Sequence, residues 1–321
     1  MTDAPEADLA VDHELAARLV REQHPDLAGP LRLVASGWDN MVYRLGRDLA
    51  VRLPRRRIAV ALIEHEQRWL PELAARLPLP IPAPVRVGRP SEEYPFPWSV
   101  VPWIEGRTVA SIDPVDRRAI AGPLAEFLTA LHVPAPDDAP INPVRGRALA
   151  ERDEVMRARF TRGEVPGSVE LLALWEAGLA APALSGPALW VHGDVHAANL
   201  VASEDAGPAG ASGGSGASGA SGASGASGPV ELVAVIDFGD LTAGDPASDL
   251  SVAWTAFDRE GRERFRARLD ELGHPIATDA GWARARAWAA GITGGMLETV
   301  SGDGPIARIA QHALAELTSG D

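Results

Sequence analysis

Two carboxylates and one amide are spaced so that they could serve phosphoryl transfer. Asp194 and Asn199 lie five residues apart in a polar turn, and Asp237 follows the next apolar segment. One carboxylate can orient an attacking hydroxyl, while an amide oxygen and a second carboxylate can hold Mg²⁺. Mg²⁺ prefers hard oxygen ligands and usually takes only about one or two carboxylates from protein, leaving the rest to water and phosphate. The three side chains therefore form a minimal set for moving a phosphoryl group.

Apolar stretches on either side predict the strands that position this set. Trp190 and Val191 precede the polar turn, and Val235 and Ile236 lead into Asp237. Ala-Ser-Gly triplets fill residues 207–229 between the two strands that carry Asn199 and Asp237. This composition cannot bury apolar area, so it predicts a flexible surface loop. The hairpin tolerates such a loop, because each doubling of loop length costs only ~0.6 kcal/mol. A neutral repeat expansion is favoured over a substrate lid.

The N-terminal third reads as a sheet with one crossing helix. Apolar segments separated by turn residues predict antiparallel strands, and apolar residues at helical spacing predict helices. The predicted strands are 31–35, 41–45, 49–53, 85–87 and 98–103, and the predicted helices are 12–24 and 57–77. After Gly106 the pattern is helical, with predicted helices at 114–132, 145–160, 168–180, 246–257, 260–272, 279–299 and 305–318. The sequence thus predicts an α+β protein with a small antiparallel-sheet lobe, 1–103, and a larger, mainly helical lobe, 104–321.

Composition excludes several functional classes. The chain has 321 residues, 46% of them apolar, which is enough for two lobes with real cores. It has no cysteine, so disulfides and thiol catalysis are excluded and a cytoplasmic location is expected. Thirty basic against 44 acidic residues give a net charge of −14, which argues against nucleic acid or an anionic membrane as partner and favours a cationic small substrate. The acidic N-terminus is no signal peptide, and no apolar run approaches the ~20 residues of a membrane span.

Three ordered motifs resemble the aminoglycoside phosphotransferase family. They are residues 192–199, residues 236–239 and residues 244–250, which read His-Gly-Asp with a later Asn, Ile-Asp-Phe-Gly, and Gly-Asp-Pro-Ala-Ser-Asp-Leu. The resemblance is colinear over roughly residues 30–260 and implies the bilobal protein-kinase-like fold. It implies that Asp194 orients or deprotonates the acceptor hydroxyl, that Asn199 and Asp237 ligate Mg²⁺, and that ATP or GTP is the phosphoryl donor. Asp249 would brace the catalytic loop, through His192 or as a helix cap.

The same resemblance implies a nucleotide site in the N-terminal lobe. Arg52 occupies the place of the strand lysine that holds the α- and β-phosphates, and Glu66 that of its ion-pair partner. Arginine is planar and bidentate, so this departure from lysine is not conservative, although it still neutralises phosphate. Ser36 and Gly37 stand at the nucleotide loop, where a plain hairpin is an equally good explanation. Pro102 would accept from adenine through its carbonyl, and Ile104 would donate its N–H.

The acceptor is less defined. An aminoglycoside-type antibiotic is favoured; a macrolide and a metabolic acceptor of the choline, homoserine or thiosugar kinase type are the alternatives. A protein kinase is excluded because only five residues separate Gly239 from Asp245, too few for a peptide platform. A non-catalytic nucleotide-binding protein is disfavoured because the catalytic set is complete. Acidic residues that could receive a polyamine, although solvated helix faces explain each of them better, are Glu151, Asp153, Glu154, Asp258, Glu260 and Asp321.

Overall fold

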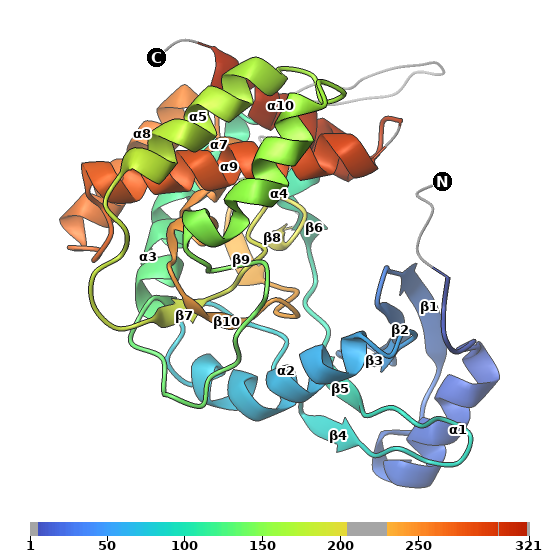
Figure 1. Cartoon of the computed structure of the whole chain (residues 1–321). Helices are drawn as coiled ribbons and strands as arrows, with labels where there is room; N and C mark the ends of the chain where they lie inside the picture. Colours follow the sequence, from blue (N-terminus) through green and yellow to red (C-terminus); the bar gives the residue numbers. More distant parts are fainter. Residues whose placement is uncertain (1–5, 204–229, 301, 320–321) are drawn as a thin grey trace, which may run out of the picture.

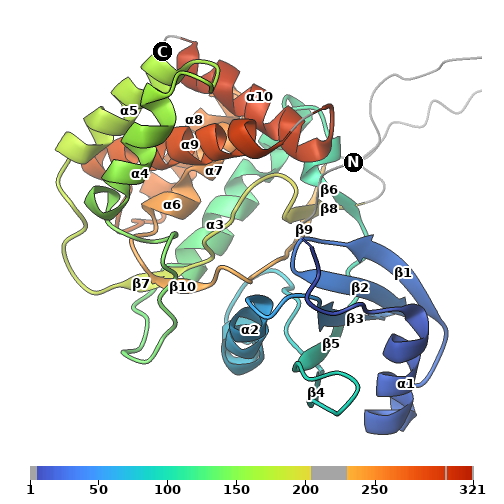
Figure 2. The same cartoon turned by 45° about the vertical axis from the view of Figure 1, so that its right-hand side comes forward.

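The computed structural model describes residues 6–203, 230–300 and 302–319. The predicted Gly/Ser/Ala loop, 207–229, lies outside the described residues. Within them, an N-terminal five-stranded antiparallel sheet is followed by a mainly helical part, as the sequence predicted (Figure 1). Figure 2 shows the sheet with helix α1 on one side of the molecule and the helices of the C-terminal part on the other. The lobe boundary at 103/104 stays a prediction.

The sheet is ordered β1-β2-β3-β5-β4. Its strands are β1 (Leu31–Ser36), β2 (Asn40–Leu45), β3 (Leu49–Pro54), β4 (Arg86–Gly88) and β5 (Trp98–Pro102). Each lies within a residue or so of a predicted strand. The register places Arg52 opposite Val42 on one side and Ser99 on the other, so the side chain stands in the middle of the sheet. Helix α1 (His13–Gln23) begins at Asp12, whose carboxylate accepts from the Leu15 N–H at 2.8 Å, and packs its apolar face on this sheet.

Helix α2 (Ala59–Ala74) joins the two parts of the molecule. Its C-terminal half contributes Trp69, Leu70 and Leu73 to the core of the helical part, where Trp69 meets Trp190 edge-on with ring centroids 5.1 Å apart. Its other contacts reach the sheet, since Gln67 Nε2 donates to the Trp98 carbonyl at 3.0 Å. In both views α2 lies between the sheet and the helices (Figures 1 and 2).

The helical part contains eight described helices. They are α3 (Ala121–Leu131), α4 (Leu149–Thr161), α5 (Ser168–Ala180), α6 (Ala247–Leu250), α7 (Val252–Thr255), α8 (Arg259–Glu271), α9 (Asp279–Thr299) and α10 (Pro305–Thr318). The single helix predicted at 246–257 is wrong: a turn at Ser251 separates α6 from α7, and the Trp254 N–H bonds to the Ser251 carbonyl only three residues back. The helix predicted at 114–132 begins as a 3₁₀ turn over Asp116–Ile120.

The helix predicted from residue 145 begins instead at Leu149. The physical reason is local, because the Asn142 side chain accepts hydrogen bonds from the N–H groups of Val144 at 2.7 Å and Arg145 at 3.0 Å. This turn competes with helix formation. Gly146 then adopts a left-handed φ of +64°, which glycine tolerates without strain. Arg145 consequently lies on a loop and not on the helix.

Two short sheets hold the segments that carry Asp194, Asn199 and Asp237. Strand β7 (Leu189–Val191) pairs with β10 (Thr242–Gly244), while β8 (Leu200–Ala202) pairs with β6 (Arg107–Thr108) and β9 (Leu232–Val235). The chain between β7 and β8 therefore contains Asp194 and Asn199, and the chain between β9 and β10 contains Asp237. Both segments are fixed at each end by strand pairing.

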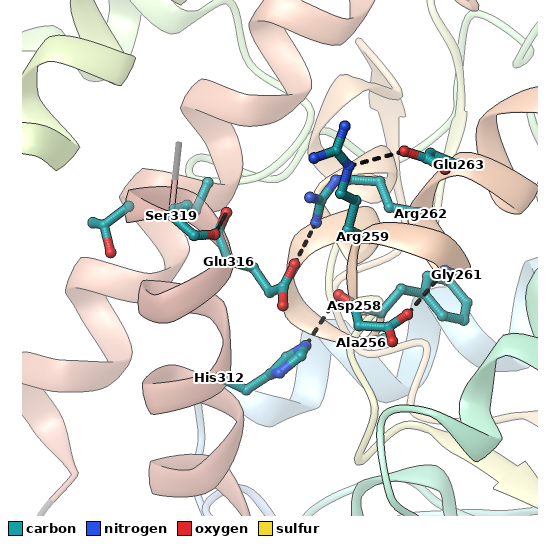
Figure 3. Close-up of polar contacts among 12 residues, drawn as sticks. Ala256, Asp258, Arg259, Gly261, Arg262, Glu263, His312, Glu316 and Ser319 are labelled. Carbon is teal, nitrogen blue, oxygen red and sulfur yellow. Dashed lines mark hydrogen bonds and ion pairs between the residues drawn. The ribbon is translucent and has the colours of Figure 1, made fainter. Parts of the chain in front are cut away.

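The C-terminal helix is fixed by polar contacts to α8 and the turn before it (Figure 3). Arg262 pairs with Glu316 at 2.9 Å, and His312 Nε2 lies 3.1 Å from the Phe257 carbonyl. Burial lowers the pKa of His312, so the ring is neutral and donates this hydrogen bond. Asp258 caps α8 by accepting from the Gly261 N–H at 2.9 Å. None of the helices in the described part of the chain is long and apolar enough to cross a membrane.

Candidate active site

The loop between β7 and β8 is cross-braced around Asp194. Asn199 Nδ2 donates to the Asp194 backbone carbonyl at 2.9 Å and to its Oδ2 at 3.2 Å. The Asp194 N–H donates to His192 Nδ1 at 3.2 Å, which leaves the proton of that ring on Nε2, 3.1 Å from the Ile236 carbonyl. Both contacts come from the amide nitrogen of Asn199, so its Oδ1 makes no hydrogen bond with Asp194. The two predicted residues are thus in direct contact.

Two basic side chains surround the Asp194 carboxylate. Arg145 Nη2 lies 3.2 Å from Oδ1, and His196 Nε2 lies 3.4 Å from Oδ2. Burial alone would raise the pKa of this carboxyl, but His196 and Arg145 outweigh it and hold the pKa well below its usual range. Burial lowers the pKa of His196, and Asp194 raises it by more, so the net direction is upward. Asp194 is therefore ionised at neutral pH and keeps a quarter of its side chain exposed.

Asp249 holds the start of the same loop. Its carboxylate is fully buried and accepts from the His192 N–H at 2.7 Å and from the Gly193 N–H at 2.9 Å. The predicted bracing is present, and it acts through backbone amides and not through the His192 ring. His132 Nε2 lies 3.0 Å from the same carboxylate, and His132 Nδ1 lies 2.9 Å from His274 Nε2.

One pattern of protons satisfies this buried chain. The Asp249 carboxylate accepts from His132 Nε2–H, His132 Nδ1 accepts from His274 Nε2–H, and His274 Nδ1 accepts from the Ile276 N–H. Both rings are then neutral. Burial and the neighbouring His132 lower the pKa of His274 to about 3, which is consistent with a neutral ring.

Asp237 has an unusual backbone conformation. It is the one non-glycine residue with positive φ in the described chain, at +65°. A left-handed aspartate costs on the order of 1 kcal/mol, and such outliers concentrate at functional sites. The side chain is exposed, and its carboxylate accepts no hydrogen bond from the described residues. Its negative charge raises the pKa of His196, in the Asp194 loop, and that of Arg52, on β3.

Two oxygen-bearing side chains of this site, Asn199 and Asp237, are free to hold a metal ion. Asn199 Oδ1 receives no hydrogen bond from the described residues, and the Asp237 carboxylate is likewise unbonded. Among the described residues no cluster of three or more His, Cys, Asp or Glu side chains could enclose a metal. Two oxygen donors with open positions suit Mg²⁺, which keeps water and phosphate as its other ligands.

The predicted nucleotide-lobe ion pair is formed. Arg52 Nη1 lies 2.6 Å from Glu66 Oε2, joining β3 to α2, and both side chains are largely buried. Burial lowers the pKa of Arg52, but Glu66 and Asp237 raise it, and the net direction is upward. Arg52 is therefore charged and stands within the field of Asp237.

Ser36 ends β1, and Gly37 begins the turn that leads to β2. The Gly37 N–H donates to the Asn40 carbonyl at 2.9 Å. Arg55 Nη1 donates to Ser36 Oγ at 3.1 Å and to the Gly37 carbonyl at 3.3 Å, so the end of β3 supports this turn.

The connection between the two parts contains the other two predicted residues. Pro102 ends β5 opposite Leu49, and Ile104 follows two residues later, outside the strand. Gly106 is pressed against β8, because a Cβ there would lie 2.4 Å from the Ala202 carbonyl oxygen. The backbone after Ile104 is therefore held in one path.

A family profile covers this whole arrangement. The profile of the phosphotransferase enzyme family matches residues 30–211 and 226–288, which include every predicted site residue. The chain belongs to this family.

Solved structures of phosphotransferases share its fold. They include the GDP complex of wild-type aminoglycoside 2'-phosphotransferase-IIIa (16% identity, TM-score 0.64, covering 94% of this chain and 96% of that one). They also include a streptomycin–ATP ternary complex of APH(2")-IIa (17%, 0.55, 90% and 91%) and the macrolide 2'-phosphotransferase type I (19%, 0.59, 98% and 100%). No curated protein matches the sequence significantly. The chain is thus a small-molecule phosphotransferase whose structural neighbours include both aminoglycoside and macrolide enzymes.

Sequence reasoning missed two contributors to the phosphotransferase site. Arg145, which contacts Asp194, was placed on a predicted helix, and Asn142 was not considered. Asn142 shapes the Arg145 turn and also donates from Nδ2 to Asp240 Oδ1 at 2.7 Å. The Asn-Pro-Val-Arg-Gly stretch at 142–146 contains the turn residues that could have indicated this loop.

Proposed function

We propose that this phosphotransferase moves the γ-phosphate of ATP or GTP to a hydroxyl group of a small molecule in a Mg²⁺-dependent reaction. The observation that carries the proposal is the contact of Asp194 with Asn199, together with the Asp237 carboxylate, which accepts no hydrogen bond from the described residues and whose charge acts on Arg52. These groups supply what phosphoryl transfer needs: a hydroxyl acceptor site, oxygen ligands for a metal and a cation for phosphate.

Asp194 receives the acceptor hydroxyl in this mechanism. The hydroxyl oxygen attacks the γ-phosphorus, the bond from that phosphorus to the β–γ bridging oxygen breaks, and the hydroxyl proton passes to the Asp194 carboxylate. Because His196 and Arg145 lower the pKa of Asp194, the residue is a weak base. Its main contribution is therefore to orient the hydroxyl in line, with the proton transferred late.

Asn199 Oδ1 and Asp237 would hold the metal ion. Mg²⁺ bound there would neutralise charge on the nucleotide phosphates. Asn199 is suited to the task because its amide protons are already committed to Asp194, which fixes the direction of Oδ1. Arg52, held by Glu66, would bind the α- and β-phosphates, and Ser36 and Gly37 would border the nucleotide.

At the connection between the lobes, the Pro102 carbonyl and the Ile104 N–H would pair with the purine. Proline loses nothing at the first of these positions, because only its carbonyl is used.

For the acceptor, aminoglycoside-type antibiotics are the first class to test, which would make the protein a resistance enzyme. The support is the family, the net charge of −14, and neighbours that include a kanamycin complex and a gentamicin complex. Macrolides come second, and choline, homoserine and thiosugar acceptors third.

The acidic residues considered for a polyamine are largely in ion pairs. Glu151 pairs with Arg147, Asp153 with Arg157, and both Asp258 and Glu260 with Arg118. Glu154 forms no ion pair with the described residues, and Asp321 lies outside them.

A coupled assay for nucleoside diphosphate release tests the proposal, run with ATP and with GTP over these acceptor classes. We expect Mg²⁺-dependent release with at least one acceptor and its loss in Asp194→Asn, which keeps the shape of the side chain but removes its charge. Failure of Mg–nucleotide to raise the melting temperature would instead indicate a protein that does not bind nucleotide.

A further inference from the structure

One arginine of helix α4 has no counter-charge. Along this helix and the loop before it, arginines are matched with carboxylates: Arg147 with Glu151, Arg157 with Asp153 at 2.9 Å, and Arg159 with Glu298 at 2.9 Å. Arg152 is the exception. Within the described residues no carboxylate lies in ion-pair distance of it, and its Nε is buried without a hydrogen-bond partner.

Arg152 also has cationic neighbours. Arg145 precedes it by seven residues and Arg159 follows it by seven; on a helix this spacing puts Arg152 and Arg159 on one flank. Burial, and then the charges of Arg159 and Arg145, lower the pKa of Arg152. Arg145 is the residue that touches the Asp194 carboxylate at 3.2 Å. Arg152 therefore lies within electrostatic reach of Arg145 and Arg159, and these three arginines form a group of like charges of which Arg145 contacts the Asp194 carboxylate.

This group of like charges is energetically unfavourable without a ligand. A partly buried guanidinium with like charges beside it loses hydration and gains repulsion. The protein as a whole carries a net charge of −14, so this group of arginines is not part of a generally basic surface. Four nearby arginines, including Arg145, have a carboxylate partner, whereas Arg152 has none among the described residues. An anion supplied from outside would pair with Arg152.

We propose that Arg152 and Arg145 form an anion-binding subsite that receives a phosphate or carboxylate group of the acceptor. The inference rests on the proposed function, because it uses Asp194 as the residue that orients the acceptor hydroxyl. The subsite belongs to the acceptor and not to the nucleotide, since Arg145 contacts Asp194 while the nucleotide phosphates have their own cation, Arg52, on β3.

The subsite makes a statement about substrate class. An acceptor that carries an anionic group a short distance from its reactive hydroxyl gains two charge-assisted contacts, whereas a polycation meets two like charges. Among the acceptor classes considered above, the subsite therefore favours homoserine, which carries a carboxylate, over choline and the aminoglycosides, and so reverses the order that the net charge alone suggests. It also adds phosphorylated sugars as a further class to test.

Orthophosphate is the first probe, because it needs no knowledge of the acceptor. The full chain is saturated with Mg²⁺ and a non-hydrolysable ATP analogue, which fills the nucleotide site, and then titrated with phosphate while the melting temperature is followed. We expect Arg152→Gln to weaken phosphate binding about tenfold or more, as loss of a charge-assisted contact implies. Arg157→Gln, on the same helix but with its own carboxylate partners, serves as the matched control and should bind phosphate like the wild type.

Arg152→Gln should fold normally, because the change removes repulsion and breaks no ion pair; its melting temperature without phosphate should equal or exceed that of the wild type. Equal phosphate affinity in wild type and Arg152→Gln overturns the subsite. An equal loss of phosphate affinity in Arg157→Gln also overturns it, because phosphate would then respond to the general surface charge and not to a site at Arg152.

Turnover gives a second test and separates the sources of the anion. Homoserine and glucose 6-phosphate are compared with choline, glucose and kanamycin in the nucleoside diphosphate assay. We expect turnover with an anionic acceptor, a KM about tenfold higher in Arg152→Gln, and little change in kcat. A fall in kcat with unchanged KM would indicate that Arg152 acts on the transferred phosphoryl group, and this would overturn an acceptor subsite. Preferred turnover of kanamycin would overturn it as well. If no acceptor reacts, the proposed function fails, and the phosphate titration still decides whether the anion site exists.

Discussion

Replacing Asp249 by asparagine tests how the catalytic loop is held. The buried carboxylate accepts from the His192 and Gly193 N–H groups and from His132. Asparagine has the same shape but only one acceptor oxygen. Whichever way its amide is turned, an NH₂ group faces a backbone N–H, and one of the two peptide donors is left unpaired.

The magnitude follows from these contacts. Hydrogen bonds to a charged acceptor contribute about 1.5–3 kcal/mol each, and a buried donor without a partner costs about 1–3 kcal/mol. We therefore expect Asp249→Asn to lower the free energy of unfolding by about 3 kcal/mol. Because the freed peptide directly precedes Asp194, we also expect kcat to fall about tenfold or more. Nucleotide affinity should change little, since Arg52 and Asp237 lie on other segments.

Urea unfolding and steady-state kinetics measure the two effects. Asp258→Asn is the matched control: this aspartate also accepts from a backbone N–H, at the start of α8, but has no contact with the loop. It should lose some stability and keep its kcat. A stability loss below about 1 kcal/mol in Asp249→Asn, or a kcat equal to that of the wild type, would refute the reasoning.

Three further predictions concern the metal, the nucleotide and pH. Asp237→Ala should abolish Mg²⁺-dependent turnover, because no neighbouring carboxylate replaces its charge; near-normal activity would contradict the metal assignment. Arg52→Ala should raise the nucleotide KM about tenfold or more, whereas an unchanged KM would leave the Glu66 ion pair a purely structural role. The pKa of His274 is about 3 in the folded protein, against a usual value of 6.5, so the unfolded chain takes up this proton first as pH falls. The contribution of His274 to stability is therefore complete above about pH 6.5 and is lost as pH falls toward 3. Urea unfolding at pH 7.5 and pH 5 should show a loss in the wild type that exceeds the loss in His274→Gln by about 2 kcal/mol; equal losses would contradict a neutral, buried His274.

The sequence predicted the parts of the fold that depend on local pattern. Alternating apolar residues between turns identified all five strands of the sheet, and helical spacing identified α5, α8, α9 and α10 within a residue or so. The contact between Asp194 and Asn199 was also accessible, because both lie on one short loop. The Arg52–Glu66 pair came through the family resemblance and is present in the structure.

The predictions that were wrong or incomplete concern side chains that redirect the backbone, or that contact residues far away in the sequence. Apolar periodicity carries no information about the two N–H groups that donate to the Asn142 side chain. The predicted helix therefore begins earlier than α4 does and includes Arg145. His132 is the last residue of the helix predicted at 114–132, and it contacts Asp249 and His274, which are 117 and 142 residues away. No local pattern in one sequence indicates such a pairing.

The position of α2 has a consequence for regulation. In protein kinases, activity is controlled by moving the helix that bears the ion-pair glutamate toward or away from the strand cation. Here Trp69, Leu70 and Leu73 anchor that helix in the core of the helical part, while Glu66, one turn earlier, reaches the sheet. Swinging α2 outward would expose those three side chains to water, at a cost of several kcal/mol, on the order of 1.5–3 kcal/mol for each. Moving α2 into an inactive position is therefore energetically unfavourable. We expect an enzyme that is constitutively active, with a rate set by its own concentration and by that of its substrates.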